Sequence, residues 1–423
     1  MMGYAAVMKV TTAAIAMAIA GSANLFAQAP APFELPLPTG QFPIGTTRWV
    51  ITDAARPEPF APGQSRQVAV VAWYPAAAGQ TGSPAPYLRE SLAEVQSFAG
   101  LIRQPGVFDS LAGVQTHAVI DATPLAGPSP LPTLVFSHGY TAIPSSYTTL
   151  LEDLASHGYV VLSVVHPYEA TAATLADGTV VTFLDEKGAM RKGIADVLAE
   201  WGPEDHTMAR ITDAKADDDR LALLRGYLSR LPLTGAALDG RVADLTLVID
   251  RLPGLPAGSI GSRVAARIDT GRIGVFGHSM GGVTAGAFCL ADARCRAGLN
   301  LDGIPQYGAM IDQTMPRPFL MVYSARPGRA GASDVIYRRA TATYYRVDVG
   351  GTLHLDFSDM NFWGGPLRAR GAYGTIAPAR AADITRQIVR EYFDQELLGQ
   401  ASPLLGGRTM LDGVTVQVMR QPK

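Results

Sequence analysis

The sequence predicts an α/β fold in which helices cover both faces of a mostly parallel central sheet. Residues 131–165 follow the order strand, helix, strand, and both strands are apolar throughout, which is typical of a parallel sheet buried on both faces. A second unit begins at 273–276, where a short strand runs into a Gly-rich turn and then into a helix. We expect both units to belong to a single domain over 44–400.

The first half of this domain has clear element signals. Residues 67–74 (QVAVVAWY) predict a strand. Residues 131–137 predict the next strand, 146–157 a helix with three leucines on one face, and 159–165 another strand. The run ADGT at 176–179 indicates a hairpin turn.

Residues 185–230 differ from the rest of the chain because they are rich in charged side chains. Apolar residues recur there at helical spacing, which predicts helices with one wet face lying on the sheet. Two interpretations of this helical insertion stay open: a lid over an active site, or a surface insertion.

The second half repeats the alternation of helices and strands. We expect helices over 242–252 and 380–398, and strands over 297–301, 319–323 and 344–349. We expect residues 401–423 to form a C-terminal tail.

The N-terminus has the features of a secretory signal. Residues 1–27 combine Lys9, an apolar stretch of about fourteen residues and a small-residue cleavage site. The apolar stretch is too short to span a bilayer. We therefore expect a cleaved signal over 1–27, a Pro-rich lead-in over 28–43, and a secreted or periplasmic mature protein.

Composition excludes several function classes. The 423 residues are 48% hydrophobic and 17% charged, with a net charge of −2, which excludes disorder and offers no basic field for nucleic acid. Two cysteines are too few for a disulfide scaffold or a structural zinc site. In an oxidising compartment Cys289 and Cys295 could form a disulfide, the alternative being two small buried apolar residues.

The motif G-x-S-x-G at 277–281 is the strongest chemical signal in the chain. Between a strand and a helix it predicts a sharp turn that lifts the Ser279 hydroxyl above the sheet, and Gly277 and Gly281 let the flanking elements approach closely. The alternative is an ordinary Gly-rich turn.

A serine nucleophile needs a base and an acid, which follow it in the order acid, histidine in this arrangement. Only His354 of the seven histidines follows Ser279, so chain order selects it as the base. We expect the other six to be structural or exposed, with His278 shaping the turn. For the acid we favour Asp302, at the end of an apolar strand, over Asp334, which could instead cap a helix.

An oxyanion intermediate needs two backbone N–H donors. One is expected from Met280, directly after the serine. The other is expected from Tyr140, because Gly139 allows a sharp turn at the end of the 131–137 strand.

These pieces together resemble the α/β-hydrolase fold and, within it, the secreted platelet-activating factor acetylhydrolase family and its bacterial relatives. The similar stretches lie between about 65 and 398 and include WYP at 73–75, FSHG at 136–139, LASHGY at 154–159, GHSMGG at 277–282 and LD at 301–302. The resemblance implies the triad Ser279, Asp302 and His354, the oxyanion donors Tyr140 and Met280, and no metal or other cofactor. It also implies a carboxylic ester hydrolase that removes short acyl chains from phospholipid-like substrates.

One stretch departs from the family pattern, and this widens the range of substrates that we expect. The run GYTA at 139–142, together with SMG at 279–281, is similar to bacterial cutinase-like polyester hydrolases. Alternatives are therefore a general carboxylesterase or lipase, a polyester hydrolase, and, from a different class, a non-catalytic binding protein of the same fold. We expect a monomer that binds a small or lipid ester, makes at most transient contact with a lipid surface, and has no nucleic-acid partner.

Overall fold

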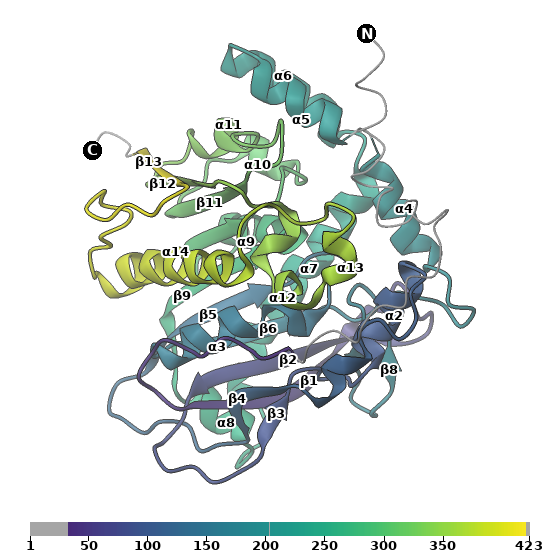
Figure 1. Cartoon of the computed structure of the whole chain (residues 1–423), viewed down its shortest axis with the longest axis vertical. Coiled ribbons are helices and arrows are strands. Elements are labelled where there is room, and N and C mark those ends of the chain that lie inside the picture. Colours follow the sequence, from purple (N-terminus) through teal and green to yellow (C-terminus); the bar gives the residue numbers. More distant parts are fainter. Residues whose placement is uncertain (1–32, 203, 420–423) are drawn as a thin grey trace.

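The computed structural model describes residues 33–202 and 204–419, so the predicted signal at 1–27 lies outside the described residues. A mixed sheet of eleven strands forms the centre, in the order β13-β12-β11-β10-β9-β5-β6-β2-β1-β4-β3 (Figure 1). A separate hairpin pairs β7 with β8. The strands are β1 (Ile44–Pro57), β2 (Ser65–Pro75), β3 (Pro84–Pro86), β4 (Gln115–Ile120), β5 (Leu131–Ser137), β6 (Val160–Val165), β7 (Ala173–Thr174), β8 (Val180–Val181), β9 (Ile268–His278), β10 (Cys295–Leu301), β11 (Phe319–Ser324), β12 (Tyr344–Val349) and β13 (Val414–Met419).

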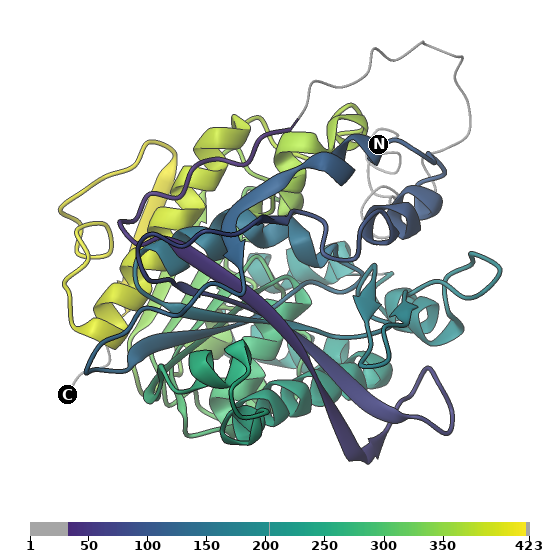
Figure 2. The same ribbon diagram turned by 90° about the horizontal axis from the view of Figure 1, so that it is seen from below.

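The centre of the sheet is parallel and its flanks are mixed. Strands β6, β5, β9, β10, β11 and β12 all run in one direction. The long β1–β2 hairpin is antiparallel and extends out of the molecule, where Figure 2 shows it as the purple ribbon. Because parallel strands end at one edge, the loops after β5, β9, β10 and β12 are brought to the same side of the sheet.

Helices cover both faces of the sheet. Helices α3 and α14 pack together on one face, and α7 and α9 pack together on the other. The longer helices are α2 (Ala93–Leu101), α3 (Thr148–Ser156), α4 (Lys192–Glu200), α5 (Glu204–Asp213), α6 (Asp217–Leu228), α7 (Pro232–Arg251), α8 (Ile260–Ala265), α9 (Met280–Ala291) and α14 (Pro378–Leu398). The shorter ones are α10 (Ala309–Asp312), α11 (Asp334–Tyr337), α12 (Met360–Trp363) and α13 (Gly365–Arg368), with 3₁₀ turns at Asp109–Gly113, Pro144–Tyr147, Leu252–Gly254 and His354–Phe357.

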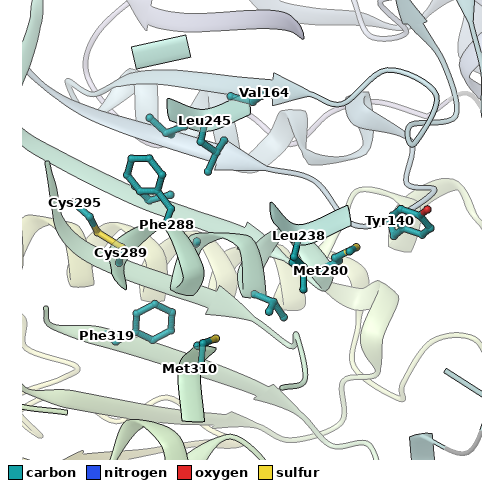
Figure 3. Packing of buried hydrophobic residues seen from close by; sticks show 14 of the residues in the cluster. Tyr140, Val164, Leu238, Leu245, Met280, Phe288, Cys289, Cys295, Met310 and Phe319 are labelled. Carbon is teal, nitrogen blue, oxygen red and sulfur yellow. A yellow bond between two sulfur atoms is a disulfide. The ribbon is translucent and has the colours of Figure 1, made fainter. Parts of the chain in front are cut away.

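A large apolar core fills the α7–α9 side of the sheet. Figure 3 shows Leu245 and Phe288 inside it and Met280 beside Leu238. On the opposite side, α14 approaches the sheet very closely, because a Cβ on Gly274 of β9 would lie 2.5 Å from the Phe393 ring. A larger residue at 274 would therefore separate α14 from the sheet.

The C-terminal end of the domain differs from the sequence prediction. Residues 401–423 were expected to be a tail, but 414–419 form β13, which pairs antiparallel with β12 and extends the sheet. The three valines of β13 pack against the core, a signal too short and too far from other strands to predict an edge strand. Residues 33–43 of the Pro-rich lead-in form neither helix nor strand, and the Thr39 N–H donates to the Asp153 carboxylate of α3 over 2.7 Å.

The charged insertion at 185–230 contains α4, α5 and α6, as its helical spacing predicts. Figure 1 shows α5 and α6 at one end of the molecule, beyond α10 and α11. They are attached there by buried apolar side chains, Met208 and Ile211 of α5 and Leu224 and Tyr227 of α6, and an exposed ion pair joins Arg225 to Asp312 over 2.7 Å. Across residues 33–202 and 204–419, no helix has the length and apolar character needed to cross a bilayer.

Cys289 of α9 and Cys295 of β10 form a disulfide (Figure 3). The bridge joins the helix that follows the G-x-S-x-G turn to the next strand of the sheet, so it fixes the far end of α9.

Candidate active site

The G-x-S-x-G motif forms a strained turn between β9 and α9. Ser279 has φ +57° and ψ −127°, outside the regions that residues with a side chain prefer. Close packing holds it there, because a Cβ on Gly281 would lie 1.9 Å from the Ser137 carbonyl oxygen. A Cβ on Gly277 would likewise lie 2.3 Å from the Gly281 carbonyl carbon. Only glycine fits at both positions, and Ser279 is left half-buried at the edge of the sheet.

His354 and Asp302 are brought together by the loops after β12 and β10. Asp302 directly follows β10, and the β12 loop crosses the end of β11 to place His354 Nδ1 2.7 Å from Asp302 Oδ2. The other carboxylate oxygen accepts from the Ser324 N–H over 2.7 Å. Burial raises the pKa of the Asp302 carboxyl, but the His354 hydrogen bond and charge outweigh it and hold the pKa at about 2. Asp302 is therefore a carboxylate at neutral pH.

Asp334, the other acid that the sequence offered, lies in a different network. Its carboxylate accepts from the Tyr344 hydroxyl over 2.6 Å and pairs with Arg346 over 2.7 Å. It is the first residue of α11 and makes no contact with His354 among the described residues. These contacts indicate that Asp334 holds α11 against β12.

Ser279 and His354 lie at neighbouring positions on the same edge, but their side chains make no hydrogen bond in the described part of the chain. The His354 ring is one-quarter exposed, whereas the Asp302 carboxylate is buried. Such contacts are often long without substrate and tighten when it binds.

The two amides expected to bind an oxyanion are both without an acceptor. In residues 33–202 and 204–419, neither the Tyr140 N–H nor the Met280 N–H has a hydrogen-bond acceptor. The loop that carries Tyr140 borders the serine, since a Cβ on Gly139 would lie 3.4 Å from Ser279 Cβ. The next residue, Thr141, has φ +56°, so this loop is also a tight, strained turn.

The aromatic ring of Tyr140 contacts the insertion. Its centroid lies 5.7 Å from that of Trp201, which ends α4. Trp201 is anchored in turn by Thr234 of α7, to which its Nε1 donates over 3.0 Å. The end of α4 therefore borders the candidate site.

A buried ionic network lies beneath the Tyr140 loop, and the sequence analysis missed it. Its centre is Asp244, whose carboxylate binds the Arg66 guanidinium over 2.6 Å and His166 Nδ1 over 2.8 Å. The His166 Nε2 lies 3.0 Å from the Ser137 hydroxyl at the end of β5. A signal for it existed in 238–245, where Arg241 and Asp244 occupy the same helix face as two buried leucines.

Nothing in the described residues is built as a metal site, because no three His, Cys, Asp or Glu side chains gather there. The chemistry available at this edge of the sheet is that of a hydroxyl, an imidazole, a carboxylate and two free amides.

Comparisons with known proteins give two kinds of relative. The family described as platelet-activating factor acetylhydrolase, isoform II, matches residues 33–187. The platelet-activating factor acetylhydrolase of Cavia porcellus is 25% identical over 248 residues, which are 58% of this chain and 52% of that protein. That of Gallus gallus is 23% identical over 274 residues, 63% of this chain and 62% of that protein. The chain thus spans about half the length of the first of these relatives.

A solved structure is similar over nearly the whole chain. A ferulic acid esterase from Streptomyces cinnamoneus superposes with a TM-score of 0.67 and 29% identity, covering 91% of this chain and 99% of that one. This likeness shows the hydrolase-like α/β fold that the sequence predicts. The family match at 33–187 includes Tyr140 but ends before Ser279, so it says nothing of the three side chains.

Proposed function

We propose that this chain is a serine esterase that hydrolyses carboxylic esters with Ser279, His354 and Asp302. The observation that carries the proposal is the 2.7 Å contact between His354 Nδ1 and Asp302 Oδ2, next to a serine on a strained strand-to-helix turn. The similarity to two groups of ester hydrolases supports it.

In the proposed reaction the Ser279 hydroxyl attacks the ester carbonyl carbon. His354 Nε2 takes the hydroxyl proton, while Asp302 holds Nδ1–H and stabilises the imidazolium. The negative oxygen that forms accepts from the Tyr140 and Met280 amides. The tetrahedral intermediate collapses and its C–O bond breaks, and the leaving alkoxide oxygen takes the proton from His354 Nε2 to become the alcohol. A water molecule then releases the acid from Ser279 by the same steps.

For the substrate we propose short acyl chains on phospholipid-like esters, because 33–187 matches the acetylhydrolase family. A second substrate class is an aromatic acyl ester such as a hydroxycinnamate. Two observations favour it: the Tyr140–Trp201 aromatic pair beside the proposed oxyanion donors, and the similarity of nearly the whole chain to a ferulic acid esterase.

Labelling and a substrate panel test the proposal. Ser279→Ala should lower kcat by about 10⁴-fold or more and abolish labelling by a fluorophosphonate probe. Unchanged activity in that variant would exclude this mechanism, and failure of the folded wild-type protein to label would favour a non-catalytic binding protein. An acetylated phospholipid, methyl ferulate, methyl butyrate and polyester film then separate the substrate classes.

We also propose that the mature protein is exported to an oxidising compartment. The Cys289–Cys295 disulfide and the signal-like sequence at 1–27 support this. Mass spectrometry of the protein from its native host should find a new N-terminus near Ala27 and bridged cysteines. An intact N-terminus with both thiols free would contradict it.

A further inference from the structure

His278, the residue before the proposed nucleophile, is buried between the two parts of the site. Its ring centroid lies 4.5 Å from that of His354, with 35° between the ring planes. Its Nε2 lies 2.9 Å from the His354 carbonyl oxygen, and its Nδ1 lies 2.9 Å from the Tyr147 hydroxyl. The Tyr147 oxygen in turn lies 3.4 Å from the Gly139 nitrogen. One line of contacts therefore runs from the loop that carries Tyr140 (residues 139–141, the oxyanion loop) to His354.

The direction of each hydrogen bond in this line follows from chemistry. A carbonyl oxygen only accepts, so His278 Nε2 must carry the proton that it donates to His354. In a neutral ring Nδ1 then has a lone pair, and the Tyr147 hydroxyl donates to it. The Tyr147 oxygen is left to accept from the Gly139 N–H. Each of the three donors has one acceptor.

Burial keeps His278 neutral. Burial first, and the neighbouring His354 second, lower the pKa of His278 to about 3. The His278 ring therefore stays uncharged while His354 gains a proton during the reaction, and the line of hydrogen bonds keeps its direction.

We infer that Tyr147 and His278 are positioning residues that hold the oxyanion loop and His354 in one fixed geometry. Tyr147 fixes Gly139, the residue before the Tyr140 amide, and His278 fixes the backbone and the ring of His354. Neither touches the ester. The inference rests on the proposed function, because it assigns these residues to an esterase site.

Tyr147→Phe is the sharpest test, because it removes one oxygen atom and keeps the ring that packs 4.8 Å from Phe136. It leaves His278 Nδ1 and the Gly139 N–H without partners, so kcat should fall by about 10- to 100-fold with KM within about twofold. The matched control is Tyr74→Phe, which removes a buried hydroxyl that donates to the Ala122 carbonyl far from the site. It should leave kcat unchanged, even if both variants lower the melting temperature.

A double variant tests whether Tyr147 and His278 act through the same line of hydrogen bonds or independently of each other. His278→Asn keeps an acceptor near the Nδ1 position but loses the donor to His354, and should also lower kcat at constant KM. The double variant Tyr147→Phe/His278→Asn should be no slower than the slower single variant, because both break one line. Multiplied effects, or an unchanged kcat in Tyr147→Phe, would overturn the inference. If kcat is unchanged while Ser279→Ala is inactive, the inference fails and the proposed function stands; an active Ser279→Ala would remove the proposed function itself.

Discussion

The fully buried guanidinium of Arg241 donates from Nη1 to the His138 carbonyl oxygen over 2.6 Å. From Nε the same group pairs with the Glu169 carboxylate over 2.7 Å. The Glu169 carbonyl oxygen, in turn, accepts from the Thr141 N–H over 2.8 Å. The loop that carries Tyr140 is thus held on both sides by one buried ion pair, which explains how a strained turn keeps its amide free.

Removing Arg241 should disturb both stability and activity. Arg241→Met leaves the buried Glu169 carboxylate with only its longer contact to Arg66 Nη2, at 3.9 Å, and we expect a loss of about 3 kcal/mol in the free energy of unfolding. The double variant Arg241→Met/Glu169→Leu should regain part of this stability, but not the activity, because nothing then holds the His138 carbonyl. Urea denaturation and ester hydrolysis at saturating substrate measure the two effects. Full activity in the double variant would show that the pair serves stability alone.

Variants of the two aspartates considered as the acid should have different effects on kcat and on stability. Asp302→Asn cannot hold the His354 tautomer, so we expect kcat to fall by about 10³- to 10⁴-fold with little change in stability. Asp334→Asn instead weakens the Arg346 and Tyr344 contacts, so it should lower the melting temperature with kcat near that of the wild type. The reverse pattern would move the acid to Asp334.

The parts of the fold that the sequence predicts are those with dense local signals. The strand at 131–137 was predicted at its exact bounds, because every residue there is apolar or small and both ends are marked. The helix predicted over 146–157 begins two residues later and ends one residue earlier, because residues 144–147 form a 3₁₀ turn and His157 is the C-cap. Strands β1 and β4 were missed because some of their buried positions hold threonine, such as Thr46 and Thr116, so the burial pattern is not visible as an apolar run or an apolar–polar alternation.

The sequence predicted only those residues of the candidate site that chain order and strand position can select. Order and strand position selected Ser279, Asp302 and His354, and the fold brings Asp302 and His354 into contact. Arg241, Glu169 and Tyr147 were missed because their roles arise from contacts between segments up to 131 residues apart, as in the Tyr147–His278 pair. Such contacts leave no spacing pattern in a single sequence.

The buried carboxyl of Asp359 should make stability depend on pH. Burial raises its pKa to about 7, although its Oδ2 accepts from the Thr149 N–H over 3.1 Å. Between the unfolded pKa of 3.8 and the folded value the native state binds more protons than the unfolded state, so stability falls as pH rises from about 4 to about 7. The full change is on the order of 4 kcal/mol.

Asp359→Asn removes this titration and keeps an oxygen for Thr149. We expect the variant to match the wild type near pH 4 and to be more stable than it at pH 8. Urea denaturation at both pH values measures the difference. Parallel pH curves for the two proteins would show that Asp359 stays charged in the fold.

Trp201 is the residue of the insertion that should affect substrate choice. Its partly exposed ring packs 5.7 Å from the buried ring of Tyr140, whose backbone carries one of the proposed oxyanion donors. If an aromatic acyl group stacks on Trp201, Trp201→Ala should raise KM for methyl ferulate by about tenfold, since such contacts contribute about 0.5–1.5 kcal/mol beyond burial. Trp201→Phe should retain most of the affinity, and KM for methyl butyrate should stay within about twofold in both variants. An equal rise in KM for the two esters would mean that Trp201 acts on the Tyr140 loop rather than on the acyl group.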